Sequence, residues 1–207
     1  MKTKNIIFDW NEVFANGIYA AGKMGDLVEH ELGLSRKDYA AKDNELNWPL
    51  CQELNRGKLT ERAYWERMIQ QNGWSLRPEQ FAALTDSVIK HPIIGTTEIA
   101  RELYDKGYRM ILVSDVWQEL KERILREYPW IPGMFDKVYW SCDYGRIKSD
   151  PDYFDFIIND ADINPAESIF IDDYHVNTER AEQAGITSIV FNDAIQLRTI
   201  LKILGIL

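Results

Sequence analysis

The sequence predicts an α/β protein in which a doubly wound parallel sheet carries an inserted helical cap subdomain. Two features predict this architecture. From residue 96 onward, helical and strand patterns alternate, as they do in parallel sheets that helices cover on both faces. Before that, a short apolar strand at 4–9 is followed by a long stretch, 16–90, that has helical patterns and no convincing strand. We therefore expect a core domain at 1–15 and 91–207 and a cap subdomain at 16–90.

The core elements follow from apolar runs that stop at glycine or at polar residues. Strands are predicted at 4–9, 108–113, 137–140, 168–171 and 187–191. Helices are predicted at 96–106, 118–127, 153–159, 176–184 and 195–204. Gly107 and Gly185 follow two of these helices, where glycine commonly ends a helix.

The inserted segment shows helical patterns throughout. Helices are predicted at 23–32, 36–46, 48–55, 60–71 and 78–90. Thr60 is a suitable N-cap, Pro78 fits a first helical turn, and Asn72-Gly73 is a helix stop. Because the segment follows the first strand directly, we expect it to lie over the active edge of the sheet as a lid.

The length, net charge, apolar runs and cysteines of the chain limit the kinds of partner and location that we expect. The 207 residues suffice for one core and a small subdomain, and the net charge of −9 disfavours binding to a nucleic acid backbone. No apolar run is long enough for a transmembrane helix, and Asp9 makes the first apolar stretch too short for a signal peptide. Cys51 and Cys142 have no CxxC spacing, so we expect free thiols in a cytoplasmic protein. Nothing indicates an oligomeric state.

Polar side chains follow the apolar runs of the predicted core at four places. They are Asp9, Ser114-Asp115, Lys148 and Asp172-Asp173. Each has an ordinary structural explanation, since a strand-end acid or serine can cap a helix and a loop lysine can be solvated. Taken together, the four favour a functional site, because parallel strands deliver their carboxyl ends to one ligand-binding edge.

This ordered set resembles the four motifs of the haloacid dehalogenase-like hydrolases, and the resemblance covers the whole chain. The matching segments are Phe8-Asp9-Trp10-Asn11-Glu12-Val13, then Val113-Ser114, then Lys148 within Gly-Arg-Ile-Lys-Ser-Asp-Pro, and finally Phe170-Ile171-Asp172-Asp173 followed by Asn177, Ala181 and Gly185. The fourth is the most specific and is similar to the magnesium-dependent phosphatase branch. The cap segment Asn55-Arg-Gly-Lys-Leu-Thr resembles sugar-phosphate phosphatases related to α-D-glucose-1-phosphate phosphatase and to the epoxide hydrolase phosphatase domain.

The resemblance implies a Rossmann-like core and a phosphatase that acts on a small phosphorylated metabolite, such as a sugar phosphate. It implies that Asp9 is the nucleophile and forms an aspartyl-phosphate that water then hydrolyses. Ser114 and Lys148 would be catalytic and would bind the phosphoryl group, together with Asp115. A lysine in this place neutralises negative charge on the attacking carboxylate and on the phosphoryl oxygens.

The resemblance also implies a Mg²⁺ cofactor. Its ligands would be Asp9, the backbone carbonyl of Asn11, and Asp173, with Asp172 beside them. Mg²⁺ prefers oxygen ligands and commonly combines one or two carboxylates with water and phosphate. The acid pair also argues against the dehalogenase branch, which uses an aspartate nucleophile and needs no metal.

Asn11 departs from the family pattern. Most phosphatases of the family have a second aspartate there, which protonates the leaving oxygen and later activates water. General acid–base catalysis is typically worth ~10²–10⁴-fold in rate, and an amide cannot provide it. Three consequences are open. The enzyme works slowly on substrates with good leaving groups, Glu12 supplies the proton, or the protein binds a phosphorylated metabolite without turnover.

Overall fold

The core of the protein is a five-stranded sheet, and all its strands run parallel. The computed structural model describes residues 3–16, 23–35 and 47–207. The strands are β1 (Asn5–Phe8), β2 (Arg109–Ser114), β3 (Lys137–Trp140), β4 (Ser168–Asp172) and β5 (Thr187–Val190). Their order is β3-β2-β1-β4-β5, so β1 lies in the centre and pairs with both β2 and β4. Chain progression reverses direction across the sheet at β1, and such switch points are where α/β sheets bind ligands.

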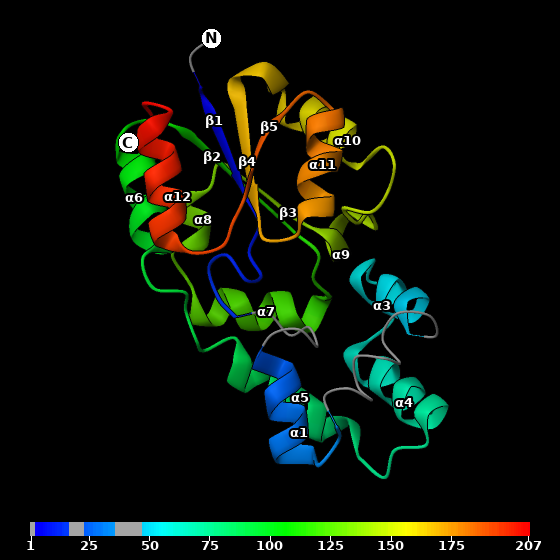
Figure 1. Cartoon of the computed structure of the whole chain (residues 1–207). Coiled ribbons are helices and arrows are strands. Elements are labelled where there is room, and N and C mark those ends of the chain that lie inside the picture. Colours follow the sequence, from blue (N-terminus) through cyan, green and yellow to red (C-terminus); the bar gives the residue numbers. More distant parts are fainter. Residues whose placement is uncertain (1–2, 17–22, 36–46) are drawn as a thin grey trace.

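Helices cover both faces of this sheet, as the doubly wound class requires. On one side lie α6 (Thr96–Asp105), α8 (Ile131–Met134) and α12 (Ala194–Ile203), and α7 (Gln118–Glu127), which lies nearer the ends of the strands, adds Leu120 and Ile124 to the same buried cluster. On the other lie α9 (Ser141–Tyr144), α10 (Tyr153–Ala161) and α11 (His175–Gln183) (Figure 1). A short 3₁₀ turn, η1 (Pro165–Glu167), precedes β4. Alternate residues of β1 enter different cores: Ile6 and Phe8 join one cluster, and Ile7 joins the other. Both faces are therefore buried, which explains the continuous apolar strands.

The helices between β1 and α6 lie at the end of the core where the strands finish (Figure 1). They are α1 (Lys23–Leu32), α3 (Trp48–Asn55), α4 (Glu61–Asn72) and α5 (Pro78–Val88). The chain leaves and re-enters the core at adjacent points. Asn16 N donates to His91 O at 3.0 Å, and Ile93 N donates to Phe14 O at 2.8 Å. The two segments that connect these helices to the core, near residues 14–16 and 91–93, thus lie side by side, which is the usual geometry of an insertion. The exact division at residues 15 and 91 remains a prediction.

The helix ends in this part follow the chemistry of their sequences. Thr60 caps α4, because its hydroxyl oxygen accepts a hydrogen bond from Ala63 N at 3.2 Å. Gly73 ends the same helix in the left-handed conformation, with a φ of 66° that glycine adopts at little cost. The helix predicted at 36–46 lies outside the described residues.

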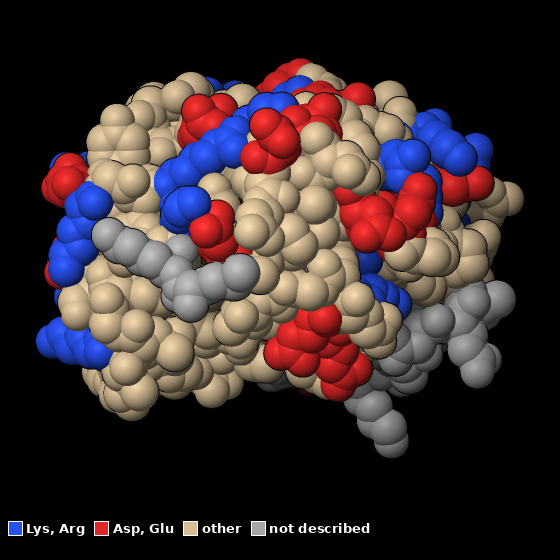
Figure 2. Space-filling view, turned by 90° about the horizontal axis from the view of Figure 1, so that it is seen from above, with Lys and Arg blue, Asp and Glu red and all other residues tan. Residues whose placement is uncertain are grey.

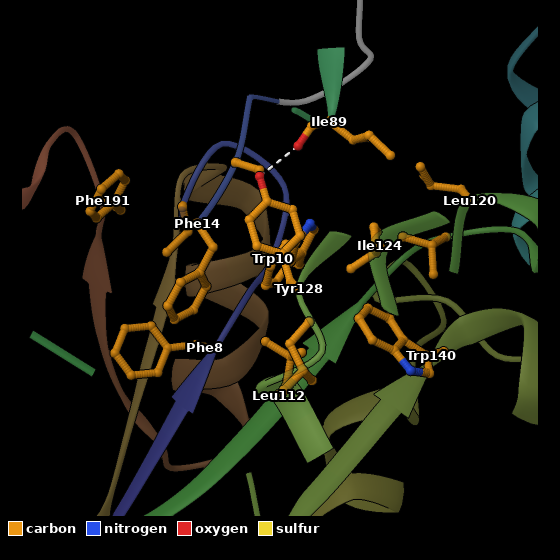
Figure 3. Close-up of a cluster of buried hydrophobic side chains, with 14 of the residues drawn as sticks. Phe8, Trp10, Phe14, Ile89, Leu112, Leu120, Ile124, Tyr128, Trp140 and Phe191 are labelled. Atoms are coloured by element: carbon orange, nitrogen blue, oxygen red, sulfur yellow. Dashed lines mark hydrogen bonds between the residues drawn. The ribbon is translucent and has the colours of Figure 1, made fainter. Parts of the chain in front are cut away.

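An aromatic cluster anchors the turn that follows β1. Trp10 stacks on Phe14 with ring centroids 5.4 Å apart and packs edge-on against Tyr128 at 4.8 Å (Figure 3). The hydroxyl of Tyr128 donates to the carbonyl oxygen of Ile89 at 2.6 Å, which ties the end of the inserted segment to the core. Since Trp10 directly follows Asp9, this buried packing fixes the backbone that carries the Asp9 carboxylate.

The surface carries charge of both signs. On the face that Figure 2 shows, Lys and Arg side chains lie among Asp and Glu side chains. That face therefore presents a mixed surface to solvent. Within the described residues, none of the helices combines the length and the apolarity needed to span a bilayer.

Candidate active site

Three strands bring polar side chains to one edge of the sheet. Asp9 directly follows β1, Ser114 is the last residue of β2, and Asp172 is the last residue of β4. Phe8 pairs with Leu112 of β2 and with Ile171 of β4, so Asp9 lies level with Asp172 and one residue before the level of Ser114. All three residues are buried, and each is no more than 4% exposed. The polar side chains at this edge are therefore largely shielded from solvent.

Lys148 completes this centre from the loop between α9 and α10. Its ammonium lies 2.7 Å from Asp9 Oδ1 and 2.7 Å from Asp172 Oδ2. The lysine is only 3% exposed, so its interpretation as a solvated loop residue is wrong. Buried charges persist when they are paired. One cation thus joins the carboxylates at the ends of the two central strands.

Asp172 also organises the start of α11. Its Oδ1 accepts from Tyr174 N at 2.8 Å, and both its oxygens accept from Asn177 Nδ2, at 3.1 and 3.2 Å. The structural interpretation of the acid pair, as the opening of a helix, therefore holds for Asp172. The same carboxylate binds Lys148, so the two roles coexist.

The carboxylates of the site form a candidate metal centre. Asp9, Asp172 and Asp173 offer oxygens that all lie within 4.8 Å of one another. Burial raises the pKa of Asp9 well above its usual value, and the charges of Asp172 and Asp173 act in the same direction against the opposing effect of Lys148. Although Asp173 is exposed as a residue, desolvation and then the charge of Asp172 raise the pKa of its carboxyl to about 6. Three acids with one lysine leave excess negative charge. An all-oxygen donor set of this kind fits a hard divalent cation such as Mg²⁺.

Ser114 offers an unused hydroxyl to the same centre. Its Oγ is fully buried and has no hydrogen-bond partner among the described residues. It does not cap the next helix, since α7 begins at Gln118 and its N-cap is Trp117. A buried hydroxyl without a partner is costly unless a ligand supplies one. The geometry thus suits an anion that accepts a hydrogen bond from Ser114.

Asp115 contacts the loop that carries Lys148. Both its oxygens accept from Lys148 N, at 3.1 and 3.2 Å. Burial raises the pKa of Asp115 to about 6, against the lowering effects of the Lys148 ammonium and of that backbone donor. In this arrangement Asp115 holds the lysine loop. The contact with substrate expected from the sequence stays a prediction.

Asn11 and Glu12 occupy the turn after Asp9. The Asn11 side chain is buried and donates to the backbone oxygen of Asp115 at 3.4 Å. Glu12 has a φ of 55°, a left-handed conformation that costs a residue with a Cβ roughly 1–2 kcal/mol. The charge of Glu12 is among the causes that raise the pKa of Asp173, so the two carboxyls share one electrostatic environment. Strained turns of this kind cluster at functional sites.

Tyr153 lies beside the site and was not identified from the sequence. It is the first residue of α10 and is 1% exposed, and its hydroxyl has no hydrogen-bond partner among the described residues. Burial raises its pKa well above the usual range, and the charges of Asp115, Lys148, Asp9 and Asp172 also act on it. Helical periodicity predicts a buried aromatic ring at this position, but it carries no signal for the neighbours of the hydroxyl.

Known proteins share this sequence pattern over most of the chain. Rat bifunctional epoxide hydrolase 2 is 25% identical over 92% of this chain and 38% of its own length. The sesquiterpene phosphatase of Aspergillus oryzae is 24% identical over 92% of this chain and 87% of its own length. The chain therefore spans less than half of the epoxide hydrolases that it matches and most of the fungal phosphatase.

Solved structures share the fold. A HAD family enzyme from Bacteroides thetaiotaomicron, in complex with magnesium and inorganic phosphate, has a TM-score of 0.69 at 20% identity over 92% of this chain and 95% of that one. The L-2-haloacid dehalogenase PA0810 has a TM-score of 0.61 at 15% identity over 90% of this chain and 83% of that one. The profile of one family, the haloacid dehalogenase-like hydrolases, matches residues 54–191, which is more than half of the 207 residues. The chain belongs to the haloacid dehalogenase-like hydrolases.

Proposed function

We propose that this protein is a Mg²⁺-dependent phosphatase for a small phosphorylated metabolite, such as a sugar phosphate, in the cytoplasm. The observation that carries the proposal is the joint geometry of the site. One buried lysine pairs with the carboxylates at the ends of β1 and β4, next to an exposed acid and a serine hydroxyl that has no hydrogen-bond partner among the described residues. The sesquiterpene phosphatase relative and the phosphate-bound structural neighbour support the same class.

In this proposal Mg²⁺ is held by Asp9, Asp173 and the backbone carbonyl of Asn11, with Asp172 beside them. The bound cation supplies charge neutralisation, which lets a carboxylate approach a phosphate dianion. The ligand oxygens of the three acids already lie within 4.8 Å of one another, which suits a single small cation. Burial is the main cause of the raised pKa values of Asp9 and Asp173, and the neighbouring carboxylates add a repulsion that such a cation would relieve.

Three side chains of the protein have separate roles in the phosphoryl transfer. Asp9 attacks phosphorus in line and forms an aspartyl-phosphate, which water hydrolyses to regenerate the carboxylate. Lys148 holds Asp9 through a 2.7 Å ion pair and has a third N–H left for a phosphoryl oxygen. Ser114, whose hydroxyl has no partner in the part of the chain that the structure describes, donates a hydrogen bond to another phosphoryl oxygen.

Protonation of the leaving group is the step in which this site differs from phosphatases that have an aspartate at the position of Asn11. The amide of Asn11 cannot protonate an alkoxide at neutral pH, and its nitrogen is directed to the backbone of Asp115. We therefore propose that the enzyme favours phosphates with good leaving groups. Glu12 is the alternative acid, since it follows Asn11 in the same turn and acts electrostatically on Asp173.

Two rival functions make different predictions. A silent phosphometabolite-binding protein would bind its ligand with Mg²⁺ and release no phosphate. A haloacid dehalogenase would release halide without metal; the likeness to a dehalogenase structure rests on the shared fold, whereas the clustered acids favour metal chemistry.

A panel of phosphorylated metabolites, assayed for phosphate release with MgCl₂ and again with excess EDTA, tests the proposal. We expect release that needs Mg²⁺ and is strongest for substrates with good leaving groups. Release of chloride from 2-chloropropionate in EDTA would support the dehalogenase instead. Mg²⁺-dependent binding of inorganic phosphate without release from any panel member would support the silent binder.

A further inference from the structure

The cap segment Asn55-Arg56-Gly57 touches the loop that carries Lys148. The carbonyl oxygen of Asn55 accepts from Ser141 Oγ at 2.7 Å. Gly57 has a φ of 70°, and a Cβ at this position would lie 2.8 Å from the carbonyl oxygen of Cys142, so only glycine allows this approach. Three consecutive residues at the C-terminal end of α3 therefore pack the cap against residues 141–150, and the middle one, Arg56, is positively charged.

Arg56 makes the strongest of these contacts. Its Nη1 donates to Asp150 Oδ2 at 2.7 Å, its Nη2 donates to Asp150 Oδ1, and Nη1 also donates to the carbonyl oxygen of Gly145 at 3.0 Å. The side chains of Arg56 and Asp150 are 21% and 19% exposed, so the pair is largely shielded from water. A planar guanidinium that binds both oxygens of a carboxylate fixes orientation as well as distance.

Asp150, which Arg56 holds, in turn binds backbone groups of the loop that carries Lys148. Its Oδ2 also accepts from Ile147 N at 3.1 Å, and its carbonyl oxygen accepts from Tyr153 N at 3.2 Å. Residue 148 thus lies between a carboxylate that the cap holds and the Asp115 carboxylate that binds its own backbone nitrogen. The backbone nitrogens of Ile147 and Lys148 are therefore both bound by acids, and Arg56 of the cap segment holds one of these acids, Asp150.

We propose that Arg56 is a positioning residue for Lys148, acting through Asp150 to hold the ammonium between Asp9 and Asp172. Arg56 sets the loop conformation and does not touch the reacting atoms. Its role in turnover rests on the proposed function. Its role in placing Lys148 does not, and the two can be tested separately.

The test compares Arg56→Lys with Arg62→Lys. Arg62 is also a cap arginine that binds carboxylates, Glu66 and Glu79, but its side chain is 68% exposed and its partners lie in the cap. Arg56→Lys keeps the positive charge but loses the paired hydrogen bonds that the guanidinium makes to both oxygens of Asp150. We expect kcat to fall about tenfold or more with KM changed less than twofold, because misplacement of a catalytic group costs rate. Arg62→Lys should match the wild type.

A second measurement is independent of turnover. Amine acetylation of the folded proteins, followed by mass spectrometry, reports the accessibility of each lysine. Labelling of Lys148 should rise severalfold in Arg56→Lys and stay unchanged in Arg62→Lys, with Lys121 as an internal reference in both. Unchanged Lys148 labelling in Arg56→Lys overturns the proposal, as does a rise in KM alone, which would make Arg56 a substrate-binding residue. Increased Lys148 labelling in a protein that releases no phosphate upholds the positioning role while the proposed function fails.

Discussion

The ammonium nitrogen of Lys148 lies 2.7 Å from Asp9 Oδ1 in the buried centre of the site. The same nitrogen lies 2.7 Å from Asp172, so one lysine balances two carboxylates that would otherwise repel each other. This arrangement serves stability as well as chemistry, and the two can be separated by mutation.

Lys148→Met should destabilise the fold strongly at neutral pH. Removing one partner of a buried charge cluster leaves uncompensated carboxylates and typically costs about 3–5 kcal/mol. Lys121→Met is the control, because Lys121 pairs with Asp143 in a more exposed setting, where the two side chains are 17% and 39% exposed. Urea unfolding at pH 7 measures both variants. Equal losses of unfolding free energy in the two variants would show that the buried Lys148 ion pairs stabilise the fold no more than the Lys121–Asp143 pair does.

Tyr153→Phe should stabilise the protein. The hydroxyl of Tyr153 is buried without a partner among the described residues, and an unsatisfied buried hydroxyl costs roughly 1–3 kcal/mol. Removing it should raise the free energy of unfolding by about 1 kcal/mol. Tyr139→Phe should do the opposite, since the Tyr139 hydroxyl donates to Asp160 Oδ2 at 2.6 Å. A destabilised Tyr153→Phe variant would mean that the hydroxyl has a partner in solution.

Stabilisation by Mg²⁺ should depend on pH. The pKa of Asp173 is raised from 3.8 to about 6, by desolvation and then by the charge of Asp172. Between these values the native state binds more protons than the unfolded state, so this group contributes stability at low pH that is lost as pH rises through 6. A cation that binds the deprotonated acid offsets that loss. MgCl₂ should therefore raise Tm more at about pH 7.5 than at about pH 5, with NaCl at equal ionic strength as the control. Equal shifts at the two pH values would contradict a carboxylate cation site.

Asn11→Asp should increase phosphate release. An aspartic acid in this turn can protonate the leaving oxygen, which is typically worth ~10²–10⁴-fold in rate. The gain should be largest for alkyl phosphates and small for p-nitrophenyl phosphate, whose leaving group needs no proton. Asn11→Ala is the control and should show no gain. If Asn11→Asp leaves the rate on alkyl phosphates unchanged while Glu12→Gln lowers it, Glu12 already acts as the acid.

Much of the fold can be predicted from the sequence. The strand after residue 4, the alternation after residue 96 and the bounds of α1, α3 and α7 follow from apolar periodicity, and the ends of α4 follow from its caps at Thr60 and Gly73. The short elements α8, α9 and η1 cannot be predicted in this way, because three or four residues carry no period. Their positions depend on packing against elements that are distant in the chain.

The site could be predicted only in part. Parallel strands bring Asp9, Ser114 and Asp172 to one edge, and a strand pattern is enough to predict this. The direction of the Asp115 carboxylate and the pairing of Arg56 with Asp150 depend on loop conformation, which a hydrophobic pattern does not specify.

The most direct test of the central claim is to trap the phosphoryl group on Asp9. Protein with Mg²⁺ is mixed with ³²P-labelled p-nitrophenyl phosphate and quenched in acid within milliseconds, and the labelled peptide is identified. We predict a label on the peptide that contains Asp9, no label in Asp9→Asn, and normal labelling in the surface control Asp105→Asn. Phosphate release through many turnovers with no protein-bound label at any quench time, or a label that persists in Asp9→Asn, would contradict the assignment of Asp9 as the nucleophile.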